Sequence, residues 1–358
     1  MRRATFAPYL MAPPPTARSL VEALCSDACA GRRTNTPGGI LARRLVVDAL
    51  RARGLDPGEQ LVPRCNGANV IAALPGDIDR WVLVGAHYDH LGANNQGIFR
   101  GADDNAASVA ILVEVAAALA AKRPDGRGVI FAAFDAEEPP FYATGAMGSQ
   151  HYARHPTVPL DHIDMMVSME LLGHAIGPAG LPSAVRDSVF ILGGERSEGT
   201  SARLDALADA APGITVRRTD AEVIPPLSDH LAFWEAGVPF LLLTGPRSAT
   251  YHTPADTPDR IEWGRVDAVA RWLERFVRDQ CARPEGRVRF LRDGRDDRST
   301  LETMRALLRP LAPVNPMAAH GLRQAEALLA RCDAKGRLGE AERIAAQGLV
   351  GAVEQAFA

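Results

Sequence analysis

The sequence is poor in cysteine and has no long uninterrupted run of apolar residues. Its five cysteines, among 358 residues, include no Cys-x-x-Cys pair. The closest two, Cys25 and Cys29, are interpreted as small buried side chains of a helix. A disulfide framework is therefore not expected, and the pattern suits a reducing compartment. Because no apolar run approaches the roughly 20 residues that span a bilayer, no membrane segment is expected either.

The sequence also lacks an excess of charge of either sign. Its formal net charge is −3, so no strong field favours nucleic acid or an anionic membrane as a partner. Near the N-terminus, prolines at positions 8 and 13–15 interrupt the stretch after Met1, and no hydrophobic region of a signal peptide develops. We therefore expect a cytoplasmic protein; a leader lost beforehand would instead make it a secreted one.

What the sequence does contain is a series of short apolar runs separated by helical segments. The runs cover residues 69–74, 81–85, 129–134, 165–169, 189–192 and 239–243. Helical spacing of apolar residues covers 17–55, with a break at 36–39, and also 105–122, 200–211 and 266–278. This alternation predicts an α/β fold, a three-layer sandwich in which helices flank a central, mostly parallel mixed sheet.

The last part of the chain differs from the rest. Residues 286–358 contain no convincing strand but hold two helical segments, near 299–311 and 318–356, the second punctuated by Gly336 and Gly339. We predict an α/β domain over residues 1–285 and a helical C-terminal extension over 286–358. The extension is expected to pack on its own subunit or on a second copy in a homo-oligomer. The leucines for this contact are Leu301, Leu307, Leu308, Leu322, Leu328 and Leu329.

Acidic and histidine residues follow four of the apolar runs. His87 ends one run, Glu137 and Glu138 follow the next, Glu170 ends a third, and His252 comes shortly after the last. Since ligands bind at the carboxyl ends of the strands in open α/β sheets, these residues should meet at one edge. Imidazole and carboxylate without thiolate suit catalytic zinc, and also cobalt or manganese.

Two acid pairs stand beside deeply apolar segments. Ionised carboxylates in the pairs Asp103-Asp104 and Glu137-Glu138 need partners or a cation there. For Asp104 an alternative is that it caps the buried helix that follows. Asp89, two residues after His87 on extended backbone, is placed to accept a hydrogen bond from the imidazole nitrogen that does not bind metal.

Five motifs in a fixed order resemble a known family. They are Gly85-Ala-His-Tyr-Asp-His90, Gly101-Ala-Asp-Asp-Asn105, Phe134-Asp-Ala-Glu-Glu138, Ser228-Asp-His230 and Tyr251-His-Thr-Pro-Ala-Asp-Thr257. Together they resemble the zinc aminopeptidases, a family that includes bacterial leucyl aminopeptidases, glutamate carboxypeptidase and glutaminyl cyclase. The resemblance covers roughly residues 17–285.

The resemblance implies a site with two zinc ions per chain. The implied ligands are His87, Asp103, Glu138, Glu170 and His252. Asp103 would bridge the ions, with a cis peptide bond between Asp103 and Asp104, and Glu170 stands where many relatives have Asp. Glu137 would be the general base, and Asp89 would orient His87. Tyr251 is either a donor to the oxyanion or a packed core residue, and Asp229 and His230 would support the site.

The function implied is that of a metalloaminopeptidase, which removes N-terminal residues from peptides or from small aminoacyl substrates. Two alternatives remain open on the same motifs. One is a zinc aminoacyltransferase like glutaminyl cyclase, an enzyme that usually works with one zinc ion. The other is a non-catalytic binding protein on the peptidase scaffold, although proteins of that kind typically lose ligands or the base, and none is missing here.

Overall fold

A single mixed sheet of eight strands forms the centre of the protein. The computed structural model describes residues 15–226, 228–284 and 286–357, and the strand order is β1-β2-β6-β3-β7-β10-β8-β9. The strands are β1 (Gly58–Val62), β2 (Gly67–Leu74), β3 (Ile78–His87), β6 (Arg127–Phe134), β7 (Ile163–Glu170), β8 (Ser188–Leu192), β9 (Thr215–Thr219) and β10 (Phe240–Thr244). The four central strands, β6, β3, β7 and β10, run parallel, so their carboxyl ends share one edge.

The sheet has the composition expected of strands that are covered on both faces. Strands β3, β6 and β7 are buried over most of their length, and all six strands predicted from apolar runs are confirmed. The sequence did not predict the edge strands β1 and β9, which carry polar residues and are only partly buried. It also did not predict a small hairpin of β4 (Gly92–Asn94) and β5 (Gly97–Phe99).

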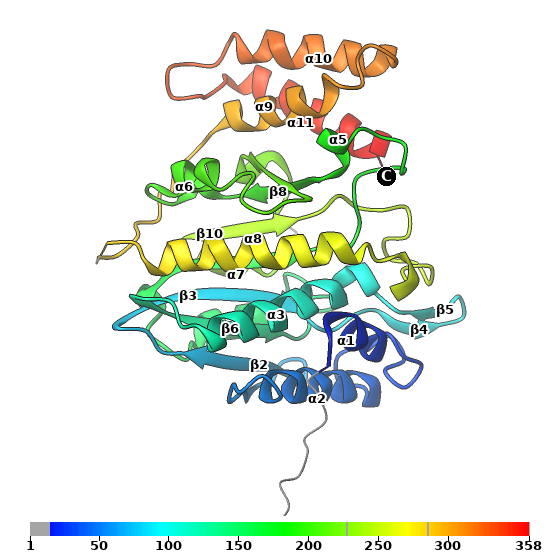
Figure 1. Cartoon of the computed structure of the whole chain (residues 1–358), viewed down its shortest axis with the longest axis vertical. Coiled ribbons are helices and arrows are strands. Elements are labelled where there is room, and N and C mark those ends of the chain that lie inside the picture. The colour runs from blue at the N-terminus through cyan, green and yellow to red at the C-terminus, as the bar shows by residue number, and fades with distance from the viewer. Residues whose placement is uncertain (1–14, 227, 285, 358) are drawn as a thin grey trace, which may run out of the picture.

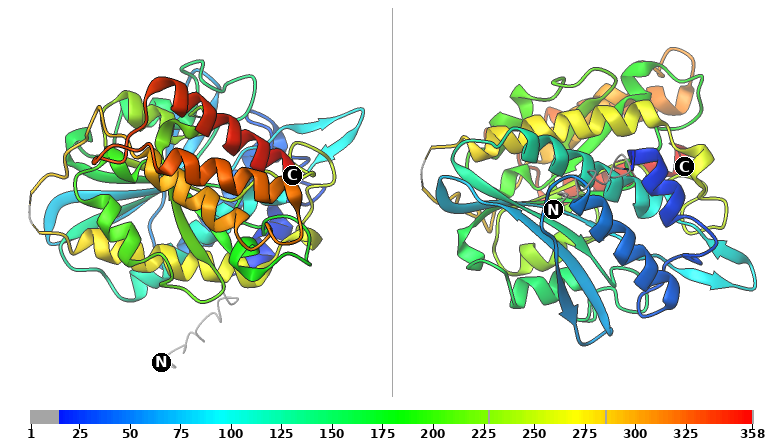
Figure 2. Two further views of the ribbon diagram at one scale, coloured as in Figure 1. Left: turned by 90° about the horizontal axis from the view of Figure 1, so that it is seen from above. Right: turned by 60° about the horizontal axis from the view of Figure 1, so that its bottom comes forward.

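Helices cover both faces of the sheet and complete the predicted three-layer sandwich (Figures 1 and 2). One face carries α1 (Ala17–Leu24), α2 (Pro37–Arg51), α3 (Ala107–Ala121) and α8 (Trp263–Cys281), and their side chains join the largest apolar core. The other carries α4 (Gly148–Arg154) and α7 (His230–Glu235). A break in the first helical stretch is present, but it covers residues 25–36 rather than 36–39: Thr36 caps α2 by accepting a hydrogen bond from Gly39, and residues 37–39 form the first turn of that helix.

Helix α3 is the most deeply buried helix described. Together with the short turn before it, over residues 102–121, it is long and apolar enough to cross a membrane by length and composition, but 72% of its 18-residue apolar window is buried within the fold. It packs against α8 and β3. Burial on almost every side explains its apolar composition, which makes it a core helix of the sandwich.

Three helices follow the sandwich and stack beyond the β8–β9 end of the sheet (Figure 1). They are α9 (Asp297–Leu308), α10 (Pro316–Leu329) and α11 (Glu340–Phe357), with Gly336 and Gly339 between the last two. Leu301, Leu307, Leu308 and Leu328 are buried, and Leu322 and Leu329 pack beside them partly buried. Packing of the helices on their own subunit is thereby confirmed, whereas contact with a second copy stays a prediction. Residues 1–14, on which the expected lack of a leader rests, lie outside the described residues.

Candidate metal centre

The predicted residues gather at the carboxyl edge of the four parallel strands. His87 is the last residue of β3 and lies opposite Phe134, the last residue of β6, and Glu170 ends β7. Glu138 follows β6 by four residues, and His252 lies in the loop after β10. Convergence follows from the parallel pairing, because each of these strands delivers its C-terminal residue to the same edge.

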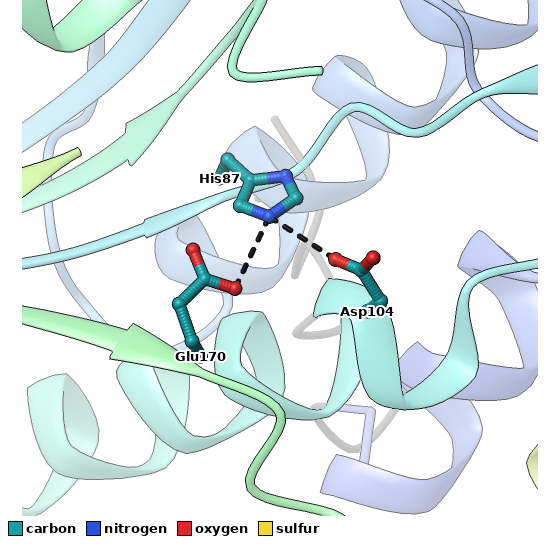
Figure 3. A group of neighbouring side chains, drawn as sticks. All are labelled: His87, Asp104 and Glu170. Atoms are coloured by element: carbon teal, nitrogen blue, oxygen red, sulfur yellow. Dashed lines mark ion pairs between the residues drawn. The ribbon is translucent and has the colours of Figure 1, made fainter. Parts of the chain in front are cut away.

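Asp104 lies between the two histidines and offers one carboxylate oxygen to each. His87 Nε2 is 3.3 Å from Asp104 Oδ1 and 3.4 Å from Glu170 Oε2 (Figure 3). On the other side, His252 Nε2 is 3.1 Å from Asp104 Oδ2 and 3.3 Å from Glu138 Oε2. The site therefore consists of two groups, each with one imidazole and one further carboxylate, that share Asp104.

The assignment of the bridging position to Asp103 was therefore wrong by one residue. The Asp103 carboxylate points away from the histidine pair and accepts hydrogen bonds from Gly173 N at 2.6 Å and from His174 Nδ1 at 2.8 Å. The cis peptide bond also lies one residue later than expected, between Asp104 and Asn105. Both aspartates adjoin the same buried helix, so the apolar pattern could not distinguish them; the non-helical dihedral angles of Asp104 and Asn105 decide which one faces the site.

The alternative role of Asp104 as a helix cap is also wrong. The residue at the N-cap of α3 is Ala106, and no side chain caps that helix terminus. The Asp104 carboxylate is almost fully buried, with histidine nitrogens on both sides, which holds its pKa well below the usual range despite burial. Its charge therefore serves the site rather than the helix.

Two buried charged groups hold the backbone of the bridging loop. The Asp256 carboxylate accepts hydrogen bonds from the backbone N–H groups of Asp103, at 2.9 Å, and Asp104, at 3.1 Å. Fully buried Arg32 donates to the carbonyl oxygens of Tyr88, at 2.8 Å, and of Asp104, at 3.1 Å. Arg32 thus links the segment that carries His87 to the loop that carries Asp104, and sequence reasoning gave it no role.

Asp89 supports the site in a way that differs in detail from the expectation. His87 Nδ1 lies 3.2 Å from the backbone oxygen of Asp89 and 3.5 Å from its carboxylate. The carboxylate itself accepts hydrogen bonds from the backbone N–H groups of Glu137, at 3.1 Å, and Glu138, at 3.3 Å. Asp89 therefore orients both the imidazole and the acid pair.

Glu137 faces the shared space without belonging to either ligand group. Its Oε2 is 3.8 Å from His87 Nε2, and its side chain is 9% exposed. Burial raises the pKa of Glu137 well above its usual value. His87 lowers this pKa in part, and the nearby carboxylates of Glu170 and Glu138 raise it further. A carboxyl group in such surroundings is suited to hold and release a proton.

The remaining charges show that this pocket favours a cation. Burial opposes protonation of His87 and His252, yet the neighbouring carboxylates outweigh it. The pKa of His87 is well above its usual value, and that of His252 is raised to about 10. Buried carboxylates that attract protons so strongly offer the same stabilisation to a metal ion.

The donor atoms also fit zinc in spacing and in chemistry. The Nε2 atoms of His87 and His252 are buried and have no hydrogen-bond partner among the described residues. Zinc ligands at about 2.0–2.1 Å in tetrahedral geometry lie roughly 3.3 Å from one another. The distances of 3.1–3.4 Å from these nitrogens to the nearest carboxylate oxygens match that spacing.

His90 is a further site residue whose role the sequence left open. Its side chain is fully buried, and its Nδ1 lies 2.7 Å from Glu138 Oε1, while the other oxygen of Glu138 faces His252. His90 Nδ1 is farther from Asp104, at 3.9 Å. We therefore assign His252 to the ligand group and His90 to the orientation of Glu138.

Three other expected residues lie around the site. Tyr251 stacks on the ring of His252 with centroids 3.9 Å apart and lines the cavity beside the ligands. Asp229 and His230 are buried behind the site, where burial raises the pKa of Asp229 to about 7 and lowers that of His230 to about 3. The position of Tyr251 suits either of its two expected roles.

The chain is similar to a known protein family and to several curated proteins. The model of Peptidase family M28 matches residues 69–277. Among curated proteins, the chain is 29% identical over 208 residues to the uncharacterized protein YfbL of Escherichia coli, which covers 52% of this chain and 63% of that one. It is 27% identical over 229 residues to the glutaminyl-peptide cyclotransferase of Drosophila melanogaster, covering 58% and 64%. The chain thus spans less than two thirds of the length of these relatives.

Solved structures share the fold at low sequence identity. LapB from Legionella pneumophila superposes with a TM-score of 0.60 at 18% identity, covering 75% of this chain and 72% of that one. Glutaminyl cyclase from Porphyromonas gingivalis superposes with a TM-score of 0.58 at 20% identity, and the match covers 75% of this chain and 100% of that one. The matched family region contains every ligand candidate described above, from His87 to His252. The chain belongs to Peptidase family M28.

Proposed function

We propose that the protein is a two-zinc aminopeptidase that hydrolyses the first peptide bond of substrates with a free α-amine. One ion would be held by His87, Asp104 and Glu170. The other would be held by Asp104, Glu138 and His252. The observation that carries the proposal is the division of the Asp104 carboxylate, whose two oxygens face two different histidines.

Charge supports two ions rather than one. Asp104, Glu138 and Glu170 contribute three negative charges within one buried site, and Glu137 adds a fourth when ionised. Two Zn²⁺ ions bring four positive charges, which balance these carboxylates, and a nearly neutral site is the arrangement that a partly dry pocket tolerates best.

The reaction then depends on a few groups of the chain. When bound, zinc supplies a Lewis acid for the scissile carbonyl and lowers the pKa of a water molecule. Glu137 accepts the proton of the attacking water and returns it to the leaving amine. The Asp89 carboxylate keeps Glu137 in place by accepting a hydrogen bond from the backbone N–H of Glu137. Tyr251 lines the cavity beside the ligands, and in this proposal it would donate to the oxygen on which negative charge develops.

The test combines zinc quantification with a screen of aminoacyl amides whose α-amine is free or blocked. We expect two zinc ions per chain and hydrolysis of the free-amine series only. Glu137→Gln should keep its zinc and lose roughly 10²–10⁴-fold in kcat, as expected for a proton-transfer group. Glu235→Gln, an exposed position on α7, is the matched control and should behave like the unmodified protein. Unchanged turnover in Glu137→Gln would refute the assigned role.

A second candidate function is cyclisation of N-terminal glutamine. It is favoured by the similarity to the Drosophila melanogaster glutaminyl-peptide cyclotransferase over 229 residues. Zinc content separates the two, because enzymes of that kind usually work with one zinc ion. Release of ammonia from a glutaminyl peptide by protein that holds a single ion, without hydrolysis of other aminoacyl amides, would favour the transferase.

A further inference from the structure

A cavity of about 560 Å³ begins at the candidate metal centre and continues beneath the C-terminal helices. Its near end is lined by site residues, including Asp104, Glu170 and His252. Its far end is lined by side chains of α9 and α11. The cavity is therefore continuous with the site and belongs to two parts of the chain that are far apart in sequence.

The floor of the cavity comes from alternate residues of two neighbouring strands. Phe190 and Leu192 of β8 and Leu242 and Thr244 of β10 line it. The intervening residues of both strands belong to the large core on the opposite face of the sheet. Since successive side chains of a strand point to opposite faces, one apolar surface is buried in the core and the other is left for the cavity.

The opposite wall comes from α9 and α11, which reach the cavity with residues at helical spacing. Met304 and Leu307 contribute from α9, and Val350, Val353 and Phe357 contribute from α11. These five side chains are apolar, so most of this wall offers an apolar surface to a substrate. At the rim, Glu354 of α11 and Arg247 of the loop before His252 approach within 4.0 Å, which brings the helices against the loop that carries a ligand.

The cavity is larger than one ordinary side chain requires. A cavity of about 150 Å³ lined by apolar side chains is enough to bind one benzene molecule. The volume here, which includes the space beside the ligand candidates, is nearly four times as large and falls in the range of about 300–1,000 Å³ that is usual for small-molecule sites. An apolar group longer than the side chain of leucine or phenylalanine therefore fits between the strands and the helices.

We propose that α9 and α11 make this cavity the binding site for the side chain of the substrate's first residue, and that it selects long apolar side chains, longer than that of leucine. The inference rests on the proposed function, because a scissile carbonyl held at the ligand candidates would lie where the cavity begins, and the side chain of the first residue would extend from there. The segment that does the selecting, residues 297–357, lies outside the region matched by the family model.

The experiment uses zinc-loaded, full-length protein and a series of aminoacyl 4-nitroanilides. The first residue is alanine, then norvaline, norleucine, 2-aminooctanoic acid and 2-aminodecanoic acid. We expect kcat/KM to rise up to roughly fourfold per added methylene, the equivalent of about 0.8 kcal/mol, at least to 2-aminooctanoic acid. A maximum at alanine or norvaline would overturn the proposal, as would the same length dependence at the second residue of a dipeptide series.

Variants of the wall test the role of the helices. Leu307→Trp and Val350→Trp fill the cavity from α9 and from α11, and each should lower the ratio of kcat/KM for 2-aminooctanoyl over alanyl substrate at least tenfold. Val350 is only partly buried, so its variant is the one expected to fold if Leu307→Trp does not. Met317→Trp and Ile344→Trp, which are 77% and 61% exposed and do not line the cavity, are the matched controls and should leave the ratio unchanged.

Binding separates failure of this inference from failure of the proposed function. Glu137→Gln protein is titrated with 2-aminooctanoic amide and with alanine amide in a calorimeter. Tighter binding of the longer amide, abolished by Val350→Trp, supports the cavity even if no substrate is hydrolysed, in which case only the proposed function fails. Equal binding of the two amides, or a loss of binding that the controls share, overturns the inference.

Discussion

The two ends of the cavity are built by opposite means. At the metal centre, side chains from strand ends and from separate loops converge, nearly all are ionisable, and the loop that carries Asp104 is fixed by buried groups such as Asp256 and Arg32. At the far end the wall is mostly apolar and comes from side chains of α9 and α11. Catalysis needs charges held in one geometry, whereas selection of an apolar group needs only a shape. Substitutions at the first end should therefore affect zinc and turnover, and those at the second should affect discrimination.

The largest effect is expected from Asp104. Asp104→Asn removes the charge that both ligand groups share, so both zinc ions should be lost and kcat/KM should fall at least about 10³-fold, or about 4 kcal/mol. Asp103→Asn, its neighbour, keeps the ligands and should weaken zinc binding by roughly 10–100-fold at most, the range for supporting residues. Zinc content after dialysis and kcat/KM provide the measurement. A greater loss in Asp103→Asn would reverse the assignment made here.

We expect the stability of the protein to depend on pH through Glu195, which lies near the contact between α9 and the sheet. It is buried beside Asp220, whose N–H donates to Thr300 of α9, and burial, followed by the Asp220 charge, raises the pKa of Glu195 from 4.5 to about 8. Between these values the folded protein keeps a proton that the unfolded chain has released, so stability falls as pH rises through that window. We expect this group to contribute a loss of about 3–5 kcal/mol between pH 5 and pH 9.

The measurement for Glu195 is the free energy of unfolding as a function of pH. The side chain of Glu195→Gln cannot ionise, so this variant should show a flatter profile. The difference in free energy of unfolding between the variant and the unmodified protein should shift in favour of the variant above pH 6. Glu198→Gln, three residues along and largely exposed, serves as the control. Parallel profiles for Glu195→Gln and the unmodified protein would show that Glu195 does not titrate in this window.

A smaller effect is expected from the ion pairs that join α11 to the sandwich. Arg343 pairs with Glu222 and lies 3.5 Å from Asp297 and 3.8 Å from Asp220, with its side chain 15% exposed. Arg343→Leu removes the cation that these carboxylates share, although Glu222 keeps Arg196 and Asp297 keeps Arg295, and it should lower the free energy of unfolding by about 1–2 kcal/mol. Denaturant titration would measure this change in the free energy of unfolding. Since α11 forms part of the cavity wall, the selectivity for long side chains should fall as well.

The matched comparison for Arg343 is Arg331, which pairs with Glu342 at 3.1 Å but is 65% exposed. Arg331→Leu should change stability by less than about 0.5 kcal/mol, because exposed pairs contribute little. An equal loss of free energy of unfolding in the two variants would mean that the buried ion pairs of Arg343 do not help to attach α11 to the sandwich.

Much of the fold and most of the site could be predicted from the sequence. Central strands such as β3, β6 and β7 are continuous apolar runs because both faces are covered, so they are easily recognised. Their carboxyl ends then place His87, Glu138 and Glu170 together. Edge strands such as β9, with the sequence Thr-Val-Arg-Arg-Thr, lack that pattern and were not predicted.

The remaining parts depend on geometry that a sequence pattern does not record. The choice between Asp103 and Asp104 depends on the backbone direction over a single non-helical turn. Arg32 lies more than fifty residues from the nearest carbonyl partner described above, Tyr88, so no local spacing could reveal its role. The cavity depends on how α9 and α11 dock onto β8 and β10, which their helical periodicity leaves open.

The position of the cavity wall has a consequence for how such a protein can diversify. Residues 297–357 come after the last ligand candidate in the chain, and their helices pack mainly on one another and on the last strand of the sheet. Mutations that accumulate there would alter which substrates fit while leaving the inherited chemistry untouched. Related proteins could thus acquire new substrate preferences through substitutions in their C-terminal helices, without an inactive intermediate.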